Sequence, residues 1–242
     1  MKLTIMIIGF LLLIGALAFS FSRRQYETPS TMSGSPGPAG VIRYMALGDS
    51  YTIGQSVATE DRWPNQLVKR LTQNGTKIEL VSNPSVTGYT TKNLIERELP
   101  VFDKTKPDFV TILIGVNDYV QGLDAQTFND NLNTILNHVQ KRLAKPKQVV
   151  LVTIPDYGKT PTGSRYGAPA ESEIGIRAFN KLITQAGTSR GLLVADIFTI
   201  SQGVTADPSL TADDGLHPSA KQYSQWTAVI YKTIQAGQLF KL

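Results

Sequence analysis

Apolar residues follow two alternating patterns along most of the chain. Short, nearly continuous apolar runs are typical of strands buried on both faces, and they occupy residues 41–47, 77–81, 108–114, 148–154 and 192–195. Apolar residues at helical spacing alternate with these runs and predict helices over residues 62–72, 91–99, 125–143, 171–187 and 219–236. The alternation predicts an α/β fold with three α/β/α layers and a five-stranded parallel sheet.

A different pattern precedes the first predicted strand. Residues 3–21 are almost wholly apolar, and Arg23 and Arg24 follow them. Residues 1–21 are therefore expected to be either a signal peptide, with Ala16-Leu17-Ala18 as cleavage site, or an N-terminal membrane anchor of about 19 residues. The sequence favours neither alternative. Both predict an extracytoplasmic domain that is secreted, periplasmic or attached to the membrane.

Residues 22–40 contain serine, proline and glycine in close succession and predict a flexible linker. Residues 41–242 then form one domain of ordinary size. The net charge of +5 is not gathered in a basic run, which argues against nucleic-acid binding. The chain has no cysteine, which excludes disulfides and cysteine nucleophiles.

Polar and glycine residues follow four of the predicted strands. The four blocks are Gly48-Asp49-Ser50, Asn83 followed by Gly88, Gly115-Val116-Asn117-Asp118, and Asp213-Asp214-Gly215-Leu216-His217-Pro218. In open parallel sheets ligands bind beyond the carboxyl ends of the strands. We therefore expect these blocks to meet in one site.

A serine in such a site needs a base to act as a nucleophile, and the base needs an orienting group. The chain has two histidines. His138 lies within a predicted helix and is interpreted as an ordinary surface or half-buried residue, whereas His217 lies in a polar loop. Asp214, three residues before His217, is the candidate orienting carboxylate, with Asp213 as the alternative. These residues lack a second histidine or a distant paired carboxylate, so no metal is expected, and no cofactor is implied.

The four blocks resemble those of the GDSL, or SGNH, hydrolase family, in order and in place. The resemblance covers residues 46–218 and implies a flavodoxin-like SGNH hydrolase fold for residues 41–242. It also implies a serine esterase with Ser50 as nucleophile, His217 as base and Asp214 as orienting group. The oxyanion hole would comprise the backbone N–H groups of Ser50 and Gly88 and the side-chain amide of Asn117.

Several other residues have simpler interpretations. Asp49 is expected to be a structural carboxylate in its loop, and Asp118 is expected to hold its loop in place. Residues 187–191 match the G-x-S-x-G pattern, but a helix precedes them and a strand follows, the reverse of a nucleophile elbow. We interpret them as a helix end and a turn.

The substrate is the least defined part of the prediction. Tyr51, Trp63 and Tyr89 are candidates to line the approach to Ser50, although Trp63 is equally interpreted as a packing residue. Residues 155–170 form a long polar loop that is the candidate substrate wall or lid. The first hypothesis is hydrolysis of a small-molecule or lipid ester, namely a short-chain carboxylic ester or a lysophospholipid. The alternatives are a carbohydrate O-acetyl esterase and a non-catalytic envelope binding module.

Overall fold

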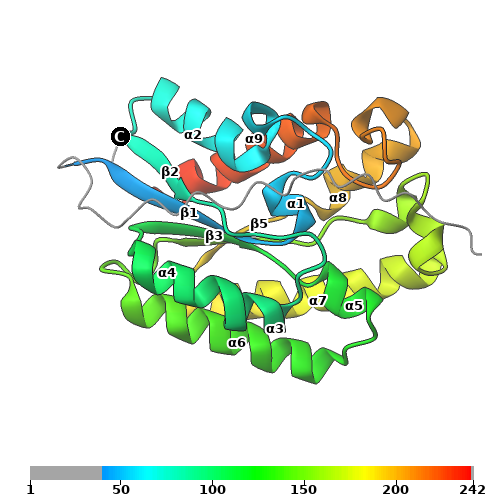
Figure 1. Ribbon diagram of the computed structural model, residues 1–242, viewed down its shortest axis with the longest axis horizontal. Coiled ribbons are helices and arrows are strands. Elements are labelled where there is room, and N and C mark those ends of the chain that lie inside the picture. Colours follow the sequence, from blue (N-terminus) through cyan, green and yellow to red (C-terminus); the bar gives the residue numbers. More distant parts are fainter. Residues whose placement is uncertain (1–39, 241–242) are drawn as a thin grey trace, which may run out of the picture. The chain divides into compact units, whose positions relative to one another are not determined.

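The computed structural model describes residues 40–240, so the predicted segment 1–21 and residues 22–39 of the predicted linker lie outside the described residues. One sheet organises the described domain (Figure 1). Its strands are β1 (Ile42–Gly48), β2 (Ile78–Ser82), β3 (Phe109–Leu113), β4 (Val149–Val152) and β5 (Leu193–Ala195). All neighbours are parallel, in the order β2-β1-β3-β4-β5. The predicted five-stranded parallel sheet is confirmed.

The strand order places a switch point beside β1. The chain passes from β1 to β2 on one side and then returns to β3 on the other side. Gly48 at the end of β1 pairs with Leu113 at the end of β3, so these two strands end together. The connections that follow β1 and β3 diverge there, and this is where ligands bind in sheets of this kind.

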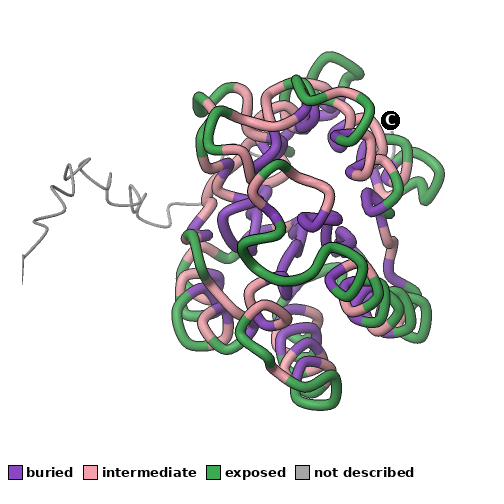
Figure 2. Tube along the Cα trace, turned by 90° about the vertical axis from the view of Figure 1, so that its right-hand side faces the viewer, coloured by how far each residue is buried: buried purple, intermediate pink, exposed green. Residues whose placement is uncertain are grey.

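Helices cover both faces of the sheet (Figure 1). One layer contains α2 (Trp63–Gln73) and α9 (Ala220–Ala236), which pack against each other. The other layer contains α3 (Thr91–Asn93), α4 (Leu99–Thr105), α6 (Ala125–Arg142) and α7 (Pro169–Arg190). Buried stretches of the chain lie between these layers and exposed stretches on their outer sides (Figure 2).

The helices pack because each presents an apolar stripe to the sheet. In α2, Trp63, Leu67 and Leu71 recur every four residues and are buried. In α6, the buried residues are the apolar ones whose spacing predicts the helix, namely Phe128, Leu132, Ile135, Leu136 and Val139. Burial of each such side chain contributes roughly 1.5–3 kcal/mol relative to an exposed one.

The predicted helix over residues 91–99 is longer and less regular than expected. It runs through α3, a π turn η2 (Leu94–Glu98) and α4. Pro100 has no N–H to donate to the carbonyl of Glu96, and the N–H of Leu99 bonds to the carbonyl of Leu94, five residues back. The wider turn therefore accommodates the proline within the helix.

Short helical segments in the connections were not predicted, because they span too few residues to show a period. These are α1 (Ser50–Ile53), η1 (Thr59–Asp61), α5 (Val116–Val120), η3 (Tyr157–Lys159), η4 (Gly163–Tyr166), α8 (Phe198–Ser201), η5 (Gln202–Thr205) and η6 (Pro208–Leu210). Within residues 40–240, no helix combines the length and the apolar character that crossing a bilayer requires.

Candidate active site

Ser50 is the first residue of α1, directly beyond the end of β1. Its side chain lies in a turn that depends on Gly48, because a Cβ at that position would lie 2.3 Å from the carbonyl oxygen of Leu113. Asp49 caps α1 by accepting a hydrogen bond from the N–H of Tyr51, at 2.9 Å. The switch point between β1 and β3 thus carries the predicted nucleophile.

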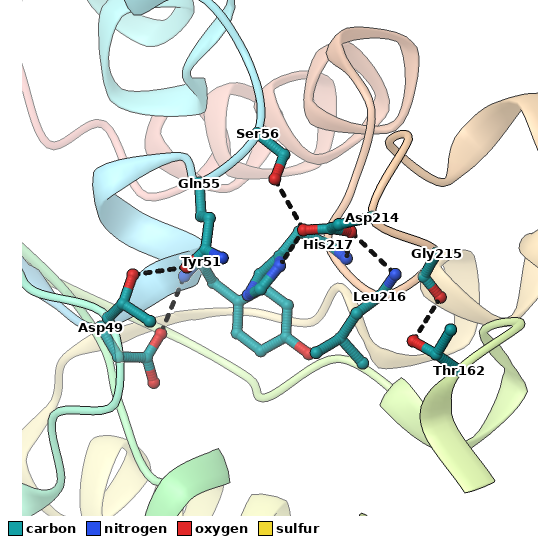
Figure 3. Close-up of polar contacts among 10 residues, drawn as sticks. Asp49, Tyr51, Gln55, Ser56, Thr162, Asp214, Gly215, Leu216 and His217 are labelled. Carbon is teal, nitrogen blue, oxygen red and sulfur yellow. Dashed lines mark hydrogen bonds and ion pairs between the residues drawn. The ribbon is translucent and has the colours of Figure 1, made fainter. Parts of the chain in front are cut away.

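His217 and Asp214 form a hydrogen-bonded pair in the loop before α9 (Figure 3). The imidazole Nδ1 lies 2.6 Å from Asp214 Oδ2, while Asp214 Oδ1 accepts bonds from the N–H groups of Leu216 and His217, each at 2.9 Å. Of the two candidate carboxylates, Asp214 is the one that bonds the imidazole. The bond leaves Nε2 as the ring nitrogen available to other groups.

The pKa of Asp214 reflects this set of contacts. Its side chain is 29% exposed, and partial burial by itself would raise its pKa. Hydrogen bonds from the Ser56 hydroxyl, from two backbone N–H groups and from the imidazole outweigh burial and lower the pKa to about 2. Asp214 is therefore ionised at neutral pH.

The segment that carries Ser50 lies beside the His217 loop. The rings of Tyr51 and His217 have centroids 5.7 Å apart, and the hydroxyl of Ser56 donates to Asp214 Oδ2 at 2.6 Å (Figure 3). Ser50 and His217 are both buried, each with 6% of its surface exposed. Residues separated by more than 150 positions along the chain therefore come together at this edge of the sheet.

The second and third blocks contact each other. The side-chain amide of Asn117 donates to the carbonyl of Tyr89 at 2.9 Å, directly after Gly88. Asn83 donates in the same way to the carbonyl of Thr52 in α1, at 2.9 Å. Gly88 has a φ of +85°, which glycine adopts without strain, and it is exposed.

Two buried carboxyl groups lie beneath the Ser50 turn. Glu98 accepts a hydrogen bond from the N–H of Gly48 at 3.0 Å, and burial raises its pKa well above the ordinary value, with Asp49 adding to the rise. Burial likewise raises the pKa of Asp49 to about 8, although the Tyr51 N–H opposes the change and Asp118 adds to it. Burial therefore favours the neutral form of both carboxyl groups.

Most of the simpler interpretations are confirmed. Asp49 caps α1, and Asp118 accepts hydrogen bonds from the N–H and hydroxyl of Thr91, which connects its loop to α3. His138 lies half-buried on α6, where its Nε2 is 2.8 Å from Asp103. Residues 187–191 end α7, and Gly191 is its left-handed cap.

The predicted approach to Ser50 needs correction. Trp63 is fully buried and donates its indole N–H to the carbonyl of Tyr51 at 3.1 Å, so it is a packing residue. Tyr51 is also buried, between His217 and Trp226. Tyr89 alone of the three aromatic candidates is half-buried. Among residues 40–240, no group of three or more histidine, aspartate or glutamate side chains is arranged to hold a metal ion.

Three residues near the site were not predicted as site residues from the sequence, namely Ser56, Thr162 and Glu98. Ser56 and Thr162 lie in polar segments without a period, so no local signal marks them. Glu98 did give a signal, because it stands between Leu94 and Phe102 on the buried stripe of its helix. A charged residue on an apolar stripe indicates either a partner or a raised pKa.

Comparison with known proteins agrees with this geometry. Residues 46–225 match the GDSL-like Lipase/Acylhydrolase family, and the chain belongs to that family. An arylesterase from Vibrio mimicus is 26% identical over 176 residues, which is 73% of this chain and 80% of the relative. The chain is accordingly a carboxylic ester hydrolase of the GDSL family.

Solved structures agree on the fold. The lipase/acylhydrolase from Enterococcus faecalis is 24% identical, with a TM-score of 0.65 over 81% of this chain and 96% of that one. The acetylxylan esterase Axe2 from Geobacillus stearothermophilus is 18% identical, with a TM-score of 0.61 over 86% of this chain and 97% of that one. The predicted SGNH hydrolase fold is confirmed.

Proposed function

We propose that the protein is a serine esterase in which Ser50 is the nucleophile, His217 the general base and Asp214 the orienting carboxylate. The observation that carries the proposal is the 2.6 Å bond between His217 Nδ1 and Asp214 Oδ2. This bond selects the tautomer in which Nε2 is free to accept the serine proton. The contact between the Tyr51 and His217 rings supports it, since Tyr51 directly follows Ser50.

The reaction then proceeds in two acyl-transfer steps. The Ser50 hydroxyl attacks the ester carbonyl while His217 takes its proton, and the tetrahedral intermediate collapses as His217 returns that proton to the leaving alcohol. A water molecule, deprotonated by His217, then attacks the acyl-enzyme and releases the carboxylic acid and free Ser50. Asp214 remains ionised and stabilises the imidazolium in both steps.

The oxyanion of each tetrahedral intermediate requires hydrogen-bond donors. We assign this role to the backbone N–H groups of Ser50 and Gly88 and to the Asn117 amide. The N–H of Ser50 is at the first position of α1, where backbone N–H groups have no acceptor within the helix. Asn117 uses one amide hydrogen to bond Tyr89, which fixes its orientation and leaves the second for the oxyanion.

We further propose that the substrate is a short-chain carboxylic ester or a lysophospholipid. Tyr166 and Ile174 support an apolar substrate group, because they are 47% and 71% exposed. Tyr166 lies close in sequence to Thr162, whose N–H and hydroxyl both donate to the carbonyl of Gly215, two residues before His217, and Ile174 lies on α7, which follows this loop. The second candidate is a carbohydrate O-acetyl esterase, which the likeness in fold to an acetylxylan esterase favours.

Ester hydrolysis by serine variants tests the assignment. Ser50→Ala should abolish hydrolysis of p-nitrophenyl acetate. The matched control is Ser189→Ala, which removes the serine of the G-x-S-x-G pattern at the end of α7 and should keep full activity. Activity that survives in Ser50→Ala would contradict the proposed mechanism.

A substrate panel separates the two candidate functions. Purified protein would be given p-nitrophenyl esters of increasing chain length, lysophosphatidylcholine and acetylated xylan. The first candidate predicts the highest kcat/KM on the simple esters or the lysophospholipid. A clear preference for acetylated xylan would favour the carbohydrate esterase, and a protein that binds but hydrolyses none of them would be a binding module.

We also propose that residues 1–21 direct export of the domain. Their apolar character supports this proposal. N-terminal sequencing of the mature protein, together with cell fractionation, tests it. An extracytoplasmic protein that begins near residue 19 indicates cleavage, and an intact membrane-bound chain indicates an anchor, whereas an intact protein in the cytoplasm would contradict export.

A further inference from the structure

Ser56 has an unusual backbone conformation for its position. Among residues 40–240, the non-glycine residues with a left-handed φ are Ser56, Lys106 and Gln238. Lys106 and Gln238 lie at the ends of α4 and α9, where a left-handed residue commonly closes a helix. Helix α1 is already closed by Gly54, so Ser56 has no such structural reason for its φ of 69°.

The contact that this conformation makes is with Asp214. The Ser56 hydroxyl donates to Oδ2 at 2.6 Å, and this is the oxygen that bonds His217 Nδ1 (Figure 3). The other hydrogen bonds to the carboxylate come from Leu216 and His217, within three residues of Asp214. Ser56 therefore supplies the hydrogen bond that connects this carboxylate to the segment carrying Ser50.

The neighbouring Gln55 makes a second connection from the same segment. Its side-chain oxygen accepts a hydrogen bond from the hydroxyl of Thr87, which directly precedes Gly88. Its backbone N–H bonds to the carbonyl of Ser50 at 3.0 Å. Residues 55 and 56 thus contact both the loop of the proposed oxyanion hole and the loop of the proposed base.

We propose that Ser56 is a positioning residue that holds Asp214, and through it the His217 imidazole, in register with Ser50. This inference rests on the proposed serine mechanism and adds a fourth side chain to it. In this role Ser56 acts through Asp214, to which its hydroxyl donates. It acts by fixing one oxygen of the carboxylate and by drawing negative charge from the atom that faces the imidazole.

Removal of the hydroxyl has two consequences. The carboxylate loses the bond that fixes it to the nucleophile segment, so fewer molecules hold the reactive geometry and kcat falls. The charge on Oδ2 also becomes less dispersed, which stabilises the protonated imidazole. Because the base must be unprotonated, the acid limb of kcat/KM then moves to higher pH.

Other ionisable groups near the pair do not reproduce this effect. Tyr51 from α1 and Tyr223 from α9 face Asp214, and burial raises the pKa of both phenols well above the ordinary value, so they stay neutral during an assay. Asp49 and Asp156 also face Tyr51, and Arg62 faces Tyr223. Asp213 adjoins Asp214 in the chain. All of these groups are unchanged by substitution at Ser56.

The test uses two variants that differ in backbone freedom. Ser56→Ala and Ser56→Gly both remove the hydroxyl, but only glycine adopts the left-handed conformation without strain. Both should lower kcat roughly tenfold with KM within about twofold, which corresponds to a hydrogen bond to a charged group. Both should also move the acid limb of kcat/KM to higher pH. Loss of activity in the alanine variant alone would indicate strain and contradict the inference.

Two further variants complete the design. Thr127→Ala removes a hydroxyl–carboxylate bond of the same 2.6 Å length, to Asp124 at the start of α6, and should leave kcat and the pH profile unchanged. In the Asp214→Asn background, Ser56→Ala should have no further effect on kcat. If Ser50→Ala is inactive while folded Ser56→Ala matches the wild type in kcat and acid limb, the inference alone is overturned. If Ser50→Ala remains active, the underlying mechanism fails with it.

Discussion

At the scale of single residues, the Ser50 turn lies on two carboxyl groups, Asp49 and Glu98, whose pKa values burial raises. A charge on Asp49 or Glu98 would lie in a desolvated environment and next to the other carboxyl. It would also repel the oxyanion that the proposed mechanism forms nearby. Protonation removes both costs while each group still accepts a backbone N–H, from Tyr51 and Gly48 respectively.

Asp49→Asn tests this account of the buried carboxyl. The folded pKa of about 8 lies above the unfolded value, so the folded protein holds the proton more tightly between about pH 4 and pH 8. The contribution of Asp49 to the stability of the wild type is therefore largest below this window and falls as pH rises through it, by up to about 1.4 kcal/mol per pH unit. Asparagine does not titrate, so the unfolding free energy of the variant should increase relative to that of the wild type as pH rises.

Urea unfolding between pH 4 and pH 8 measures the difference. Asp130→Asn, on the exposed side of α6, is the control and should follow the wild-type profile. If the difference in unfolding free energy between Asp49→Asn and the wild type is the same at every pH, Asp49 is charged in the folded protein. The same conclusion would follow if the variant lost stability relative to the wild type as pH rises.

Asn117→Ala tests the proposed oxyanion donor. Removal of one such donor should lower kcat by roughly 10²–10³ with KM nearly unchanged, because the bond forms in the transition state. The control is Asn83→Ala, which loses an amide–carbonyl bond of the same 2.9 Å length beside α1 and should lower kcat by less than about tenfold. Steady-state kinetics on p-nitrophenyl acetate provides the comparison, and an effect confined to KM would rule out the oxyanion role.

At the scale of secondary-structure elements, the site is built from short segments that follow long ones. The strands β1 and β3 were predicted from nearly continuous apolar runs, and the long helices α6, α7 and α9 from apolar residues at helical spacing. The helices α1 and α5, which carry Ser50 and Asn117, were not, because five residues or fewer show no period. Their polar residues could be placed only through the rule that ligands bind beyond the carboxyl ends of strands.

The loop of residues 155–170 has a more definite role than the predicted wall or lid. It contains the short helices η3 and η4, and Thr162 donates twice to the carbonyl of Gly215, through its N–H at 2.9 Å and its hydroxyl at 3.0 Å. These bonds attach the loop to the segment between Asp214 and His217. Residues 155–170 are therefore expected to hold the loop that carries His217 in place.

Thr162→Val removes one of the two bonds and keeps the shape of the side chain. We expect kcat to fall a few fold, since a neutral hydrogen bond contributes about 0.5–1.5 kcal/mol, and the melting temperature to change by only a few degrees. Thr184→Val, which removes a threonine hydrogen bond within α7, should leave kcat unchanged. Equal kinetics for the two variants would show that the loop does not support the base.

At the scale of the whole molecule, the fold could be predicted because the hydrophobic pattern alternates strictly between strand and helix. The four polar blocks could be predicted because each follows a strand or its loop, in the order that the family shows. The contact between Ser56 and Asp214 could not be predicted, because it joins residues 158 positions apart and neither local sequence encodes it. The π turn before Pro100 was also unpredicted, since its residues keep an ordinary helical pattern.

The central claim is that Ser50 is activated by His217 at the switch point of the sheet. Labelling with a fluorophosphonate, followed by peptide mass spectrometry, tests it most directly, because an activated serine displaces fluoride from the probe and becomes phosphonylated. The account predicts one adduct per folded chain, on Ser50, and no adduct in His217→Ala. A folded protein that hydrolyses esters while its adduct lies on another serine, or that labels Ser50 equally without the imidazole, would contradict it.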